Sequence, residues 1–152
     1  MHITDTINIL CAIDSNFVPW CGIMLTSVFE NNQLEKVCAY VIVDESVDKI
    51  QERTFQKMAT KYNQSVEILH VASRTFEQFP TNENWSKAMY YRLLVADLLP
   101  ESVEKIIYFD CDIIVTRSLR EMWDIDITDY AIAGVVDTWS KRLYEHVGLS
   151  EE

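Results

Sequence analysis

Two carboxylates interrupt an apolar run late in this chain. The run IIYFDCDIIV, at 106–115, has eight apolar residues, and its two polar residues are Asp110 and Asp112. In an extended strand, residues two apart point to the same side, so the two carboxylates share one face and Cys111 points the other way, into the core. Paired carboxylates repel each other and are costly to bury alone. A divalent cation relieves both problems, and oxygen ligands favour Mg²⁺, Mn²⁺ or Ca²⁺ over Zn²⁺.

The same pair has a plainer interpretation as an exposed strand end, with one aspartate capping a turn. However, Ile113, Ile114 and Val115 follow directly, so the chain does not become polar there as a surface loop would. We therefore favour the metal-binding interpretation. A bound cation would also supply the positive charge that a phosphate-bearing ligand needs.

The composition limits the classes of function. The chain has 152 residues, of which 49% are hydrophobic, and this predicts one packed domain over residues 1–152. Its net charge of −11 disfavours partners such as nucleic acid and anionic lipid. With only three glycines, the chain cannot build a G-x-G-x-x-G or Walker loop. We see no apolar run long enough for a membrane span and no signal peptide.

The four cysteines are scattered, without a C-x-x-C pair: Cys11, Cys21, Cys38 and Cys111. We expect buried free thiols in a reducing cytoplasm. A zinc site or a disulfide framework is the alternative.

Strand-like and helix-like segments alternate along the chain, which predicts a doubly wound α/β domain. The expected helices are 19–32, 46–63 (capped by Ser46) and 86–99 (ended by Pro100), with a short helical piece near 118–125. The expected strands are 7–13, 37–43, 65–71, 105–110, 113–116 and 131–136, and 72–85 is expected to be a loop.

Acidic residues recur where the expected strands end. Asp14, Asp44, Asp110 and Asp137 each follow such a strand. In open α/β sheets ligands bind outside the carboxyl ends of the strands. Several acids on this one rim therefore suggest a metal or a polar ligand.

Several blocks of the sequence resemble glycosyltransferase family 8. They are AIDSNF at 12–17, the long block at 86–115 that ends in Asp-x-Asp, and the later SLREMWDIDI and AGVVDTW. The resemblance covers residues 7 to 139, and the pattern is similar to that of bacterial lipopolysaccharide galactosyl- and glucosyltransferases. It implies a GT-A (Rossmann-like) nucleotide-sugar-binding domain with a mostly parallel central sheet flanked by helices.

The resemblance also implies an activity and a cofactor. The family transfers a hexose, here galactose or glucose, from UDP-glucose or UDP-galactose to a saccharide acceptor such as the lipopolysaccharide core, with retention of configuration. Asp110 and Asp112 would hold Mn²⁺, with Mg²⁺ as the alternative, against the diphosphate. Arg92 would reach the phosphates or the donor sugar, and Asp137 matches a site-facing, catalytic carboxylate. We expect a cytoplasmic protein, or a peripheral one at the inner membrane when full-length.

Four further residues match the nucleoside-binding positions of the family. Asp14 and Asn16 would contact the uridine, Phe17 would stack on the uracil, and Ala12 would lie against the base. Each assignment has a structural alternative. Asp14 could only cap the following helix, Phe17 could be a core aromatic, and Arg92 could be a surface residue in an ion pair.

The chain departs from the family pattern after residue 139. The family continues with a His-x-x-Gly-x-x-Lys-Pro-Trp motif whose histidine is the third protein ligand of the metal, and HVGLSEE does not match it. We therefore expect the N-terminal, nucleotide-binding part of a longer enzyme, truncated at the C-terminus, with weak nucleotide binding and little or no transfer. Two rival classes are a phosphatase resembling the haloacid dehalogenases and a non-catalytic binding or scaffold module.

Overall fold

A parallel sheet with helices on both faces forms the core of the chain. The computed structural model describes residues 5–81 and 86–135. Its four strands lie in the order β3-β2-β1-β4, and all neighbours pair in parallel. They are β1 (Ile7–Ile13), β2 (Val37–Val43), β3 (Ser65–His70) and β4 (Ile107–Tyr108). This confirms the predicted α/β class with its parallel sheet.

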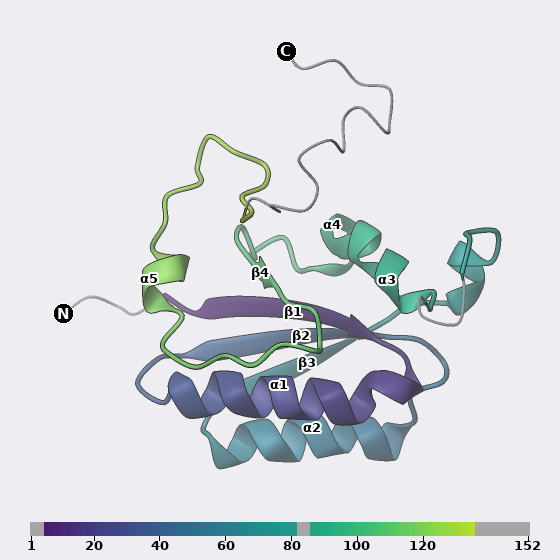
Figure 1. Cartoon of the computed structure of the whole chain (residues 1–152), viewed down its shortest axis with the longest axis horizontal. Helices are drawn as coiled ribbons and strands as arrows, with labels where there is room; N and C mark the ends of the chain where they lie inside the picture. Colours follow the sequence, from purple (N-terminus) through teal and green to yellow (C-terminus); the bar gives the residue numbers. More distant parts are fainter. Residues whose placement is uncertain (1–4, 82–85, 136–152) are drawn as a thin grey trace.

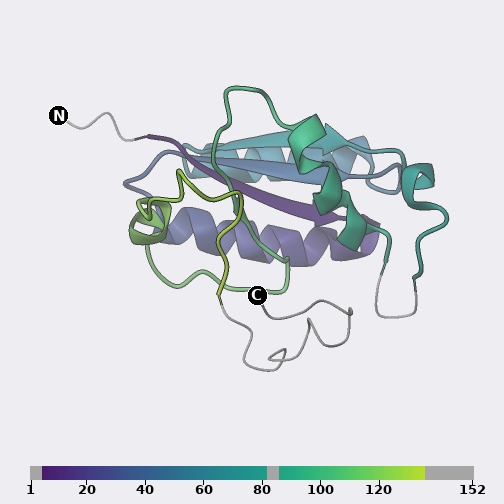
Figure 2. The same cartoon turned by 90° about the horizontal axis from the view of Figure 1, so that it is seen from above.

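Two long helices cover one face of the sheet, and a set of short helical turns covers the other (Figure 1). The long helices are α1 (Val18–Asn31) and α2 (Lys49–Lys61). The opposite face carries η2 (Ser73–Phe76), α3 (Ala88–Tyr91), η3 (Arg92–Leu94) and α4 (Val95–Leu98). Two further pieces are η1 (Ser15–Phe17), which directly follows β1, and α5 (Arg120–Trp123), which comes after β4. Figure 2 looks onto the sheet from above, so the strands pass in front of the two long helices.

The strands are apolar at nearly every position because both of their faces are buried. In β1, Ile7, Ile9 and Cys11 face the two long helices, whereas Leu10 packs beneath α3. Strand side chains alternate between the two faces, so one run of apolar residues feeds two separate core clusters. The predicted strands 7–13 and 37–43 have the predicted bounds, and 65–71 ends one residue early.

The two long helices match their predictions, with one correction at a start. α1 begins with a proline in its first turn, where a missing N–H costs nothing. The start of α2 was predicted wrongly. Its cap is Asp48 rather than Ser46, and Asp48 forms a capping box with Gln51. Ser46 instead binds Asp44, so its hydroxyl is used before the helix begins.

The helix expected at 86–99 is broken into three short pieces. Its residues pass from α3 through the 3-10 turn η3 into α4, which ends before Pro100 as expected. Two side chains in the middle are held by distant partners, Tyr91 by Asp44 and Arg92 by Asp110. A mid-helix 3-10 turn is typical of a functional or strained position. We attribute the break to these two tethers.

The strands expected at 105–110 and 113–116 were largely wrong. Only Ile107 and Tyr108 pair as a strand, and residues 113–116 form none. The backbone of Val115 bonds to side chains of α1 instead of a neighbouring strand: its N–H donates to Ser27 Oγ at 2.9 Å and its carbonyl accepts from Asn31 Nδ2 at 3.0 Å. Backbone groups need partners but not necessarily strand partners.

The strand expected at 131–136 is also wrong over the part that the structure describes. Residues 131–135 are irregular and exposed, and Val135 is 94% exposed. An apolar run forms a buried strand only beside a sheet edge or under a covering layer. Residues 131–135 pair with no strand among the described residues, and all five are exposed.

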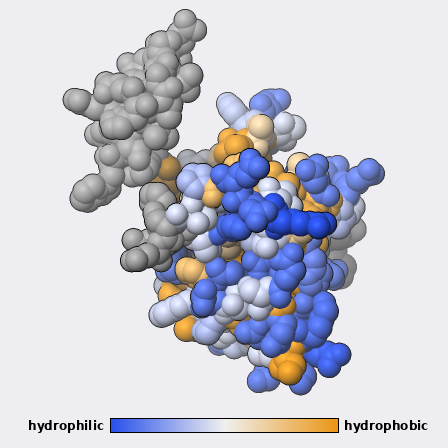
Figure 3. Space-filling view, turned by 90° about the vertical axis from the view of Figure 1, so that its right-hand side faces the viewer, coloured by the Kyte–Doolittle hydropathy of each residue, from blue (hydrophilic) through white to orange (hydrophobic). Residues whose placement is uncertain are grey.

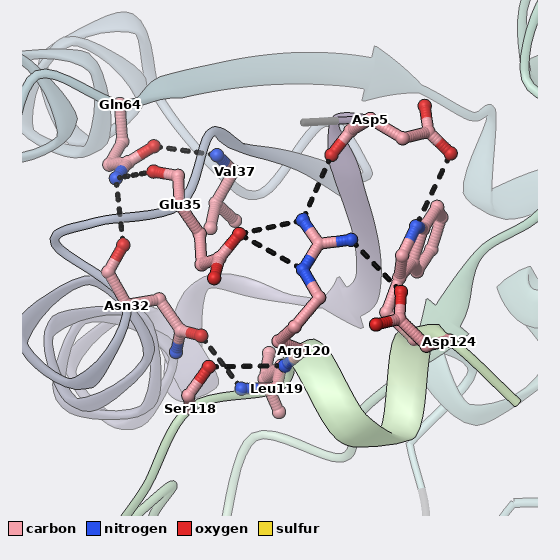
Figure 4. Close-up of polar contacts among 10 residues, drawn as sticks. Asp5, Asn32, Glu35, Val37, Gln64, Ser118, Leu119, Arg120 and Asp124 are labelled. Atoms are coloured by element: carbon pink, nitrogen blue, oxygen red, sulfur yellow. Dashed lines mark hydrogen bonds and ion pairs between the residues drawn. The ribbon is translucent and has the colours of Figure 1, made fainter. Parts of the chain in front are cut away.

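A polar cluster ties α5, the short helix expected near 118–125, to the amino-terminal edge of the sheet (Figure 4). The guanidinium of Arg120 contacts Glu35 Oε2 at 2.6 Å and Asp124 Oδ1 at 3.1 Å, and it also donates to the backbone carbonyl of Asp5. Side chains far apart in sequence thus fix the segment that follows β4 against the start of β1.

All four cysteines are free thiols, and Cys11, Cys21 and Cys111 are buried. The predicted burial is confirmed for these three, and Cys38 is half-buried. Among the described residues, no helix has the length and apolar character that a bilayer span requires.

Candidate functional site

The carboxyl ends of the strands carry most of the residues singled out from the sequence. β1 leads through Asp14 into η1, which holds Asn16 and Phe17, and β4 leads to Asp110. Since β1 and β4 are parallel neighbours, these residues lie at the same edge of the sheet. Viewed from this side, the surface is largely hydrophilic with scattered hydrophobic patches (Figure 3).

The Asp-x-Asp segment, Asp110–Asp112, is a turn rather than a strand and is called the Asp turn below. Its side chains nevertheless point as predicted. Asp110 and Asp112 are exposed, whereas Cys111 between them is buried. The turn is held at both ends. Before it, the N–H of Phe109 donates to the carbonyl of Leu10 at 2.9 Å. After it, Val115 is bound to α1. The chain thus presents two outward carboxylates on a segment anchored to the sheet and to a helix.

Arg92 meets the Asp turn directly. Its Nη2 lies 2.9 Å from Asp110 Oδ1, its Nε donates to the carbonyl of Met89, and its guanidinium stacks 4.3 Å from the ring centre of Tyr108. Burial raises the pKa of Tyr108, and the nearby Arg92 charge opposes that rise. Arg92 does form an ion pair at the surface, as its structural alternative proposed. Its partner, however, is Asp110, a predicted metal ligand.

The four predicted nucleoside-binding residues lie on the last part of β1 and on the η1 turn that follows it. Asp14 caps the turn, since its Oδ1 accepts from the N–H of Asn16 at 2.9 Å. Asn16 is exposed. Phe17 is 38% exposed, so the alternative that it is a core aromatic is wrong. Ala12 is half-buried on β1, on the face shared with α3.

A buried network beside this edge was missed in the sequence. The hydroxyl of Tyr91 donates to Asp44 Oδ2 at 2.6 Å, and Asp44 also accepts from Ser46. Ser46 Oγ in turn accepts from the N–H of Ser15 at 3.0 Å. The network joins α3, the end of β2 and η1, and so holds both flanks of the candidate site. Asp44 stood out as a rim acid, but no local signal pairs it with a tyrosine 47 residues away.

Replacing Tyr91 with phenylalanine should lower the free energy of unfolding by about 2 kcal/mol at pH 7, because a buried carboxylate loses a donor. Burial, followed by the bond to Asp44, raises the pKa of Tyr91. The folded protein then keeps this proton above pH ~10, where the unfolded chain loses it. The contribution of Tyr91 to the free energy of unfolding is therefore complete below pH ~10 and declines as the pH rises further.

Urea unfolding between pH 7 and pH 11 would measure both the cost of the substitution and the pH dependence of stability. The stability of the wild-type protein should fall above pH ~10, and that of Tyr91→Phe should fall less. The matched control is Tyr130→Phe, because Tyr130 is 71% exposed. Equal alkaline slopes for the wild-type protein and Tyr91→Phe would contradict the assigned bond.

A shallow groove of about 750 Å³ lies between α1, α2 and the segment after the Asp turn. Its lining is mainly apolar and includes Ile23, Met58 and Ile114, and Glu30 is its one acidic residue. A metal-bound diphosphate needs charged or polar partners, so this groove does not match the chemistry of the Asp turn. Asp137, the predicted catalytic carboxylate, lies outside the described residues.

Comparison with known proteins identifies a family for the chain. The model of "Glycosyl transferase family 8" matches residues 8–149. The chain belongs to this family. A lipopolysaccharide 1,3-galactosyltransferase of Salmonella typhimurium is 29% identical over 143 residues, covering 91% of this chain and 42% of the relative. The general stress protein A of Bacillus subtilis is 28% identical, covering 99% of this chain and 53% of the relative.

The fold has a close counterpart among solved structures. The galactosyltransferase LgtC, crystallised with donor and acceptor sugar analogues, superposes with a TM-score of 0.83 at 20% identity, covering 95% of this chain and 52% of LgtC. This shows the GT-A fold that the sequence predicted. The chain spans about half the length of the curated relatives it matches. Membership in family 8 disfavours the haloacid-dehalogenase-like phosphatase.

Proposed function

We propose that this chain is the donor-binding part of a retaining hexosyltransferase that takes galactose or glucose from a UDP-sugar and transfers it to a saccharide acceptor such as the lipopolysaccharide core. Family membership supports glycosyl transfer. Its relatives include proteins named lipopolysaccharide galactosyl- and glucosyltransferases. The donor nucleotide, the sugar, the metal and the acceptor are parts of the proposal.

One observation carries the proposal: the Asp turn, Arg92 and the η1 loop share one edge of the sheet. Arg92 touches Asp110 at 2.9 Å, and η1 follows the strand that pairs with β4. A nucleoside diphosphate needs a polar contact for the base and ribose, and positive charge for the phosphates. In this glycine-poor, acidic chain, Arg92 and a cation that the carboxylates would hold would meet the second need at this edge.

The Asp turn fits a hard divalent cation. Asp110 and Asp112 supply oxygen ligands, which suit Mn²⁺ or Mg²⁺, and their exposure leaves room for ligand phosphates and water. Two carboxylates are fewer ligands than such an ion takes. The remaining ligands would come from the diphosphate, from water and from residues outside the described part of the chain.

When bound, the cation would supply Lewis-acid stabilisation of the charge that grows on the departing UDP. The protein groups have separate tasks. Arg92, steadied by Tyr108, would donate to a phosphate oxygen. Phe17 would offer its exposed ring to the uracil, and Asp14 would accept from the uridine. Asp137 remains a predicted site-facing carboxylate.

Replacing Arg92 with glutamine should change two affinities in opposite directions. UDP binding in the presence of Mn²⁺ should weaken by roughly 10- to 100-fold, because a charge-assisted bond to phosphate is lost. Mn²⁺ alone should bind about two- to fivefold more tightly, because Asp110 loses an exposed cationic partner. Calorimetry would measure the first affinity, and electron paramagnetic resonance of free Mn²⁺ the second.

Lys61→Gln is the matched control, since it removes the same charge from an exposed residue that ends α2. It should alter neither affinity appreciably. If Arg92→Gln lowered the affinity for Mn²⁺, or left UDP binding intact, the assigned role of Arg92 would be wrong.

A further inference from the structure

Behind the Asp turn, on its buried side, three thiols converge. Cys11 comes from the middle of β1, Cys21 from the first turns of α1, and Cys111 from the turn itself. They are 1%, 0% and 8% exposed. The Sγ atoms of Cys11 and Cys21 are 3.5 Å apart, and all three Sγ atoms lie within 4.8 Å of one another.

This spacing matches three ligands of one soft metal ion. A Zn–S bond of about 2.3 Å places tetrahedral ligand sulfurs about 3.8 Å apart, and trigonal ones about 4.0 Å apart. The observed separations, 3.5 Å for one pair and at most 4.8 Å for the others, bracket these values, so an ion could enter with little movement of the backbone. Thiolate ligands without oxygen or nitrogen select d¹⁰ ions such as Zn²⁺ and Cu⁺ over Mn²⁺ and Mg²⁺.

The fourth cysteine shows that the convergence is particular to these three. Cys38 is half-buried on β2 and packs in the cluster beneath α3, on the opposite face of the sheet. Free cysteines often fill cores as small apolar residues. Simple core filling explains the burial of Cys11, Cys21 and Cys111, but it does not require three sulfurs from three separate elements to meet at one point.

We propose that Cys11, Cys21 and Cys111 form a binding site for one thiophilic d¹⁰ cation, Zn²⁺ or Cu⁺. The site would be distinct from the carboxylate pair although both share the turn, with Asp110 and Asp112 facing outward. A bound ion would tie the turn to β1 and α1. Because it would bind only the folded chain, it would also stabilise the fold. The proposal does not depend on the donor nucleotide.

The test is a titration of reduced, metal-free protein with Cd²⁺. Binding is monitored through the thiolate-to-cadmium charge-transfer absorption, which carboxylate ligands do not produce. We expect the band to saturate at one equivalent, and to appear also when Cd²⁺ is added to Zn²⁺-loaded protein, because the softer ion replaces Zn²⁺ on thiolates. Cys21→Ala should bind on the order of 100-fold more weakly, since one of three ligands is lost. Cys38→Ala is the matched control and should bind like the wild-type protein.

A thermal scan gives an independent readout. Zn²⁺ in about 100-fold excess over its dissociation constant should raise the Tm of the wild-type protein and of Cys38→Ala by about 5 °C or more, but not that of Cys21→Ala. If Cys21→Ala does not fold, Cys111→Ser replaces it. An absent band at one equivalent, or a band that persists without Cys21 or Cys111, would mean that the thiols only fill the core.

Discussion

Replacing Asp112 with asparagine should weaken Mn²⁺-dependent binding of UDP by at least about 100-fold. Asparagine keeps the size and one oxygen of the side chain but removes the charge that a hard cation requires. Even indirect partners of metal ligands commonly contribute 10- to 100-fold to affinity, and a direct ligand should exceed that. Calorimetric titration of UDP at fixed Mn²⁺ would measure the effect.

The structure supports a clean comparison for this variant. Asp112 is exposed on a turn whose ends are held by other residues, so the fold should survive the change. Asp97→Asn is the matched control, because Asp97 is an exposed aspartate on α4. Equal UDP affinities for the wild-type protein and Asp112→Asn would assign the carboxylate a structural role and remove the metal site from the proposal.

Replacing Phe29 with alanine should lower the free energy of unfolding by about 3–5 kcal/mol. Phe29 is fully buried on α1, and its ring centre lies 6.0 Å from that of Tyr62 at the end of α2. The substitution would leave a cavity between both long helices and the sheet. Such a loss is a large part of the stability of a domain of this size.

Urea unfolding of Phe29→Ala against Leu34→Ala would test this placement. Leu34 is 97% exposed, and its truncation should change the free energy of unfolding by less than about 0.5 kcal/mol. If Phe29→Ala cost less than about 1 kcal/mol, the packing of α1 on the sheet would be wrong.

The central strands and long helices could be predicted because their signals are local. The apolar runs at 7–13 and 37–43 carry enough β-branched residues to indicate strands buried on both faces. The helix at 46–63 showed an apolar residue at each turn. Its start was misplaced because two good cap residues, Ser46 and Asp48, stand two positions apart, and Asp44 binds the first of them.

The remaining elements depend on partners far away in the sequence. Residues 113–116 have the composition of a strand, but Ser27 and Asn31 of α1 take the backbone bonds of Val115. The helix at 86–99 breaks where Tyr91 and Arg92 reach Asp44 and Asp110. Periodicity cannot reveal such contacts, because it reports only which side of an element is apolar.

The sequence predicted where the site residues lie on the sheet better than it predicted the contacts among them. The i, i+2 spacing predicted outward carboxylates and an inward Cys111, and this outcome holds although the segment is a turn. The ion pair between Arg92 and Asp110 joins two residues that were assigned separate tasks. The convergence of the cysteines could not be foreseen, because Cys11 on β1 and Cys111 in the turn after β4 meet only through the order of the sheet.

Titration of this chain with UDP, with and without Mn²⁺ and with ADP as a competitor, tests the central claim most directly. The proposal predicts that UDP binds only when Mn²⁺ is present and that ADP competes weakly, because the η1 loop would recognise uracil and the Asp turn the metal-bound diphosphate. UDP binding that is unchanged without Mn²⁺, or ADP binding as tight as that of UDP, would contradict the assignment of this edge as a metal-dependent uridine diphosphate site.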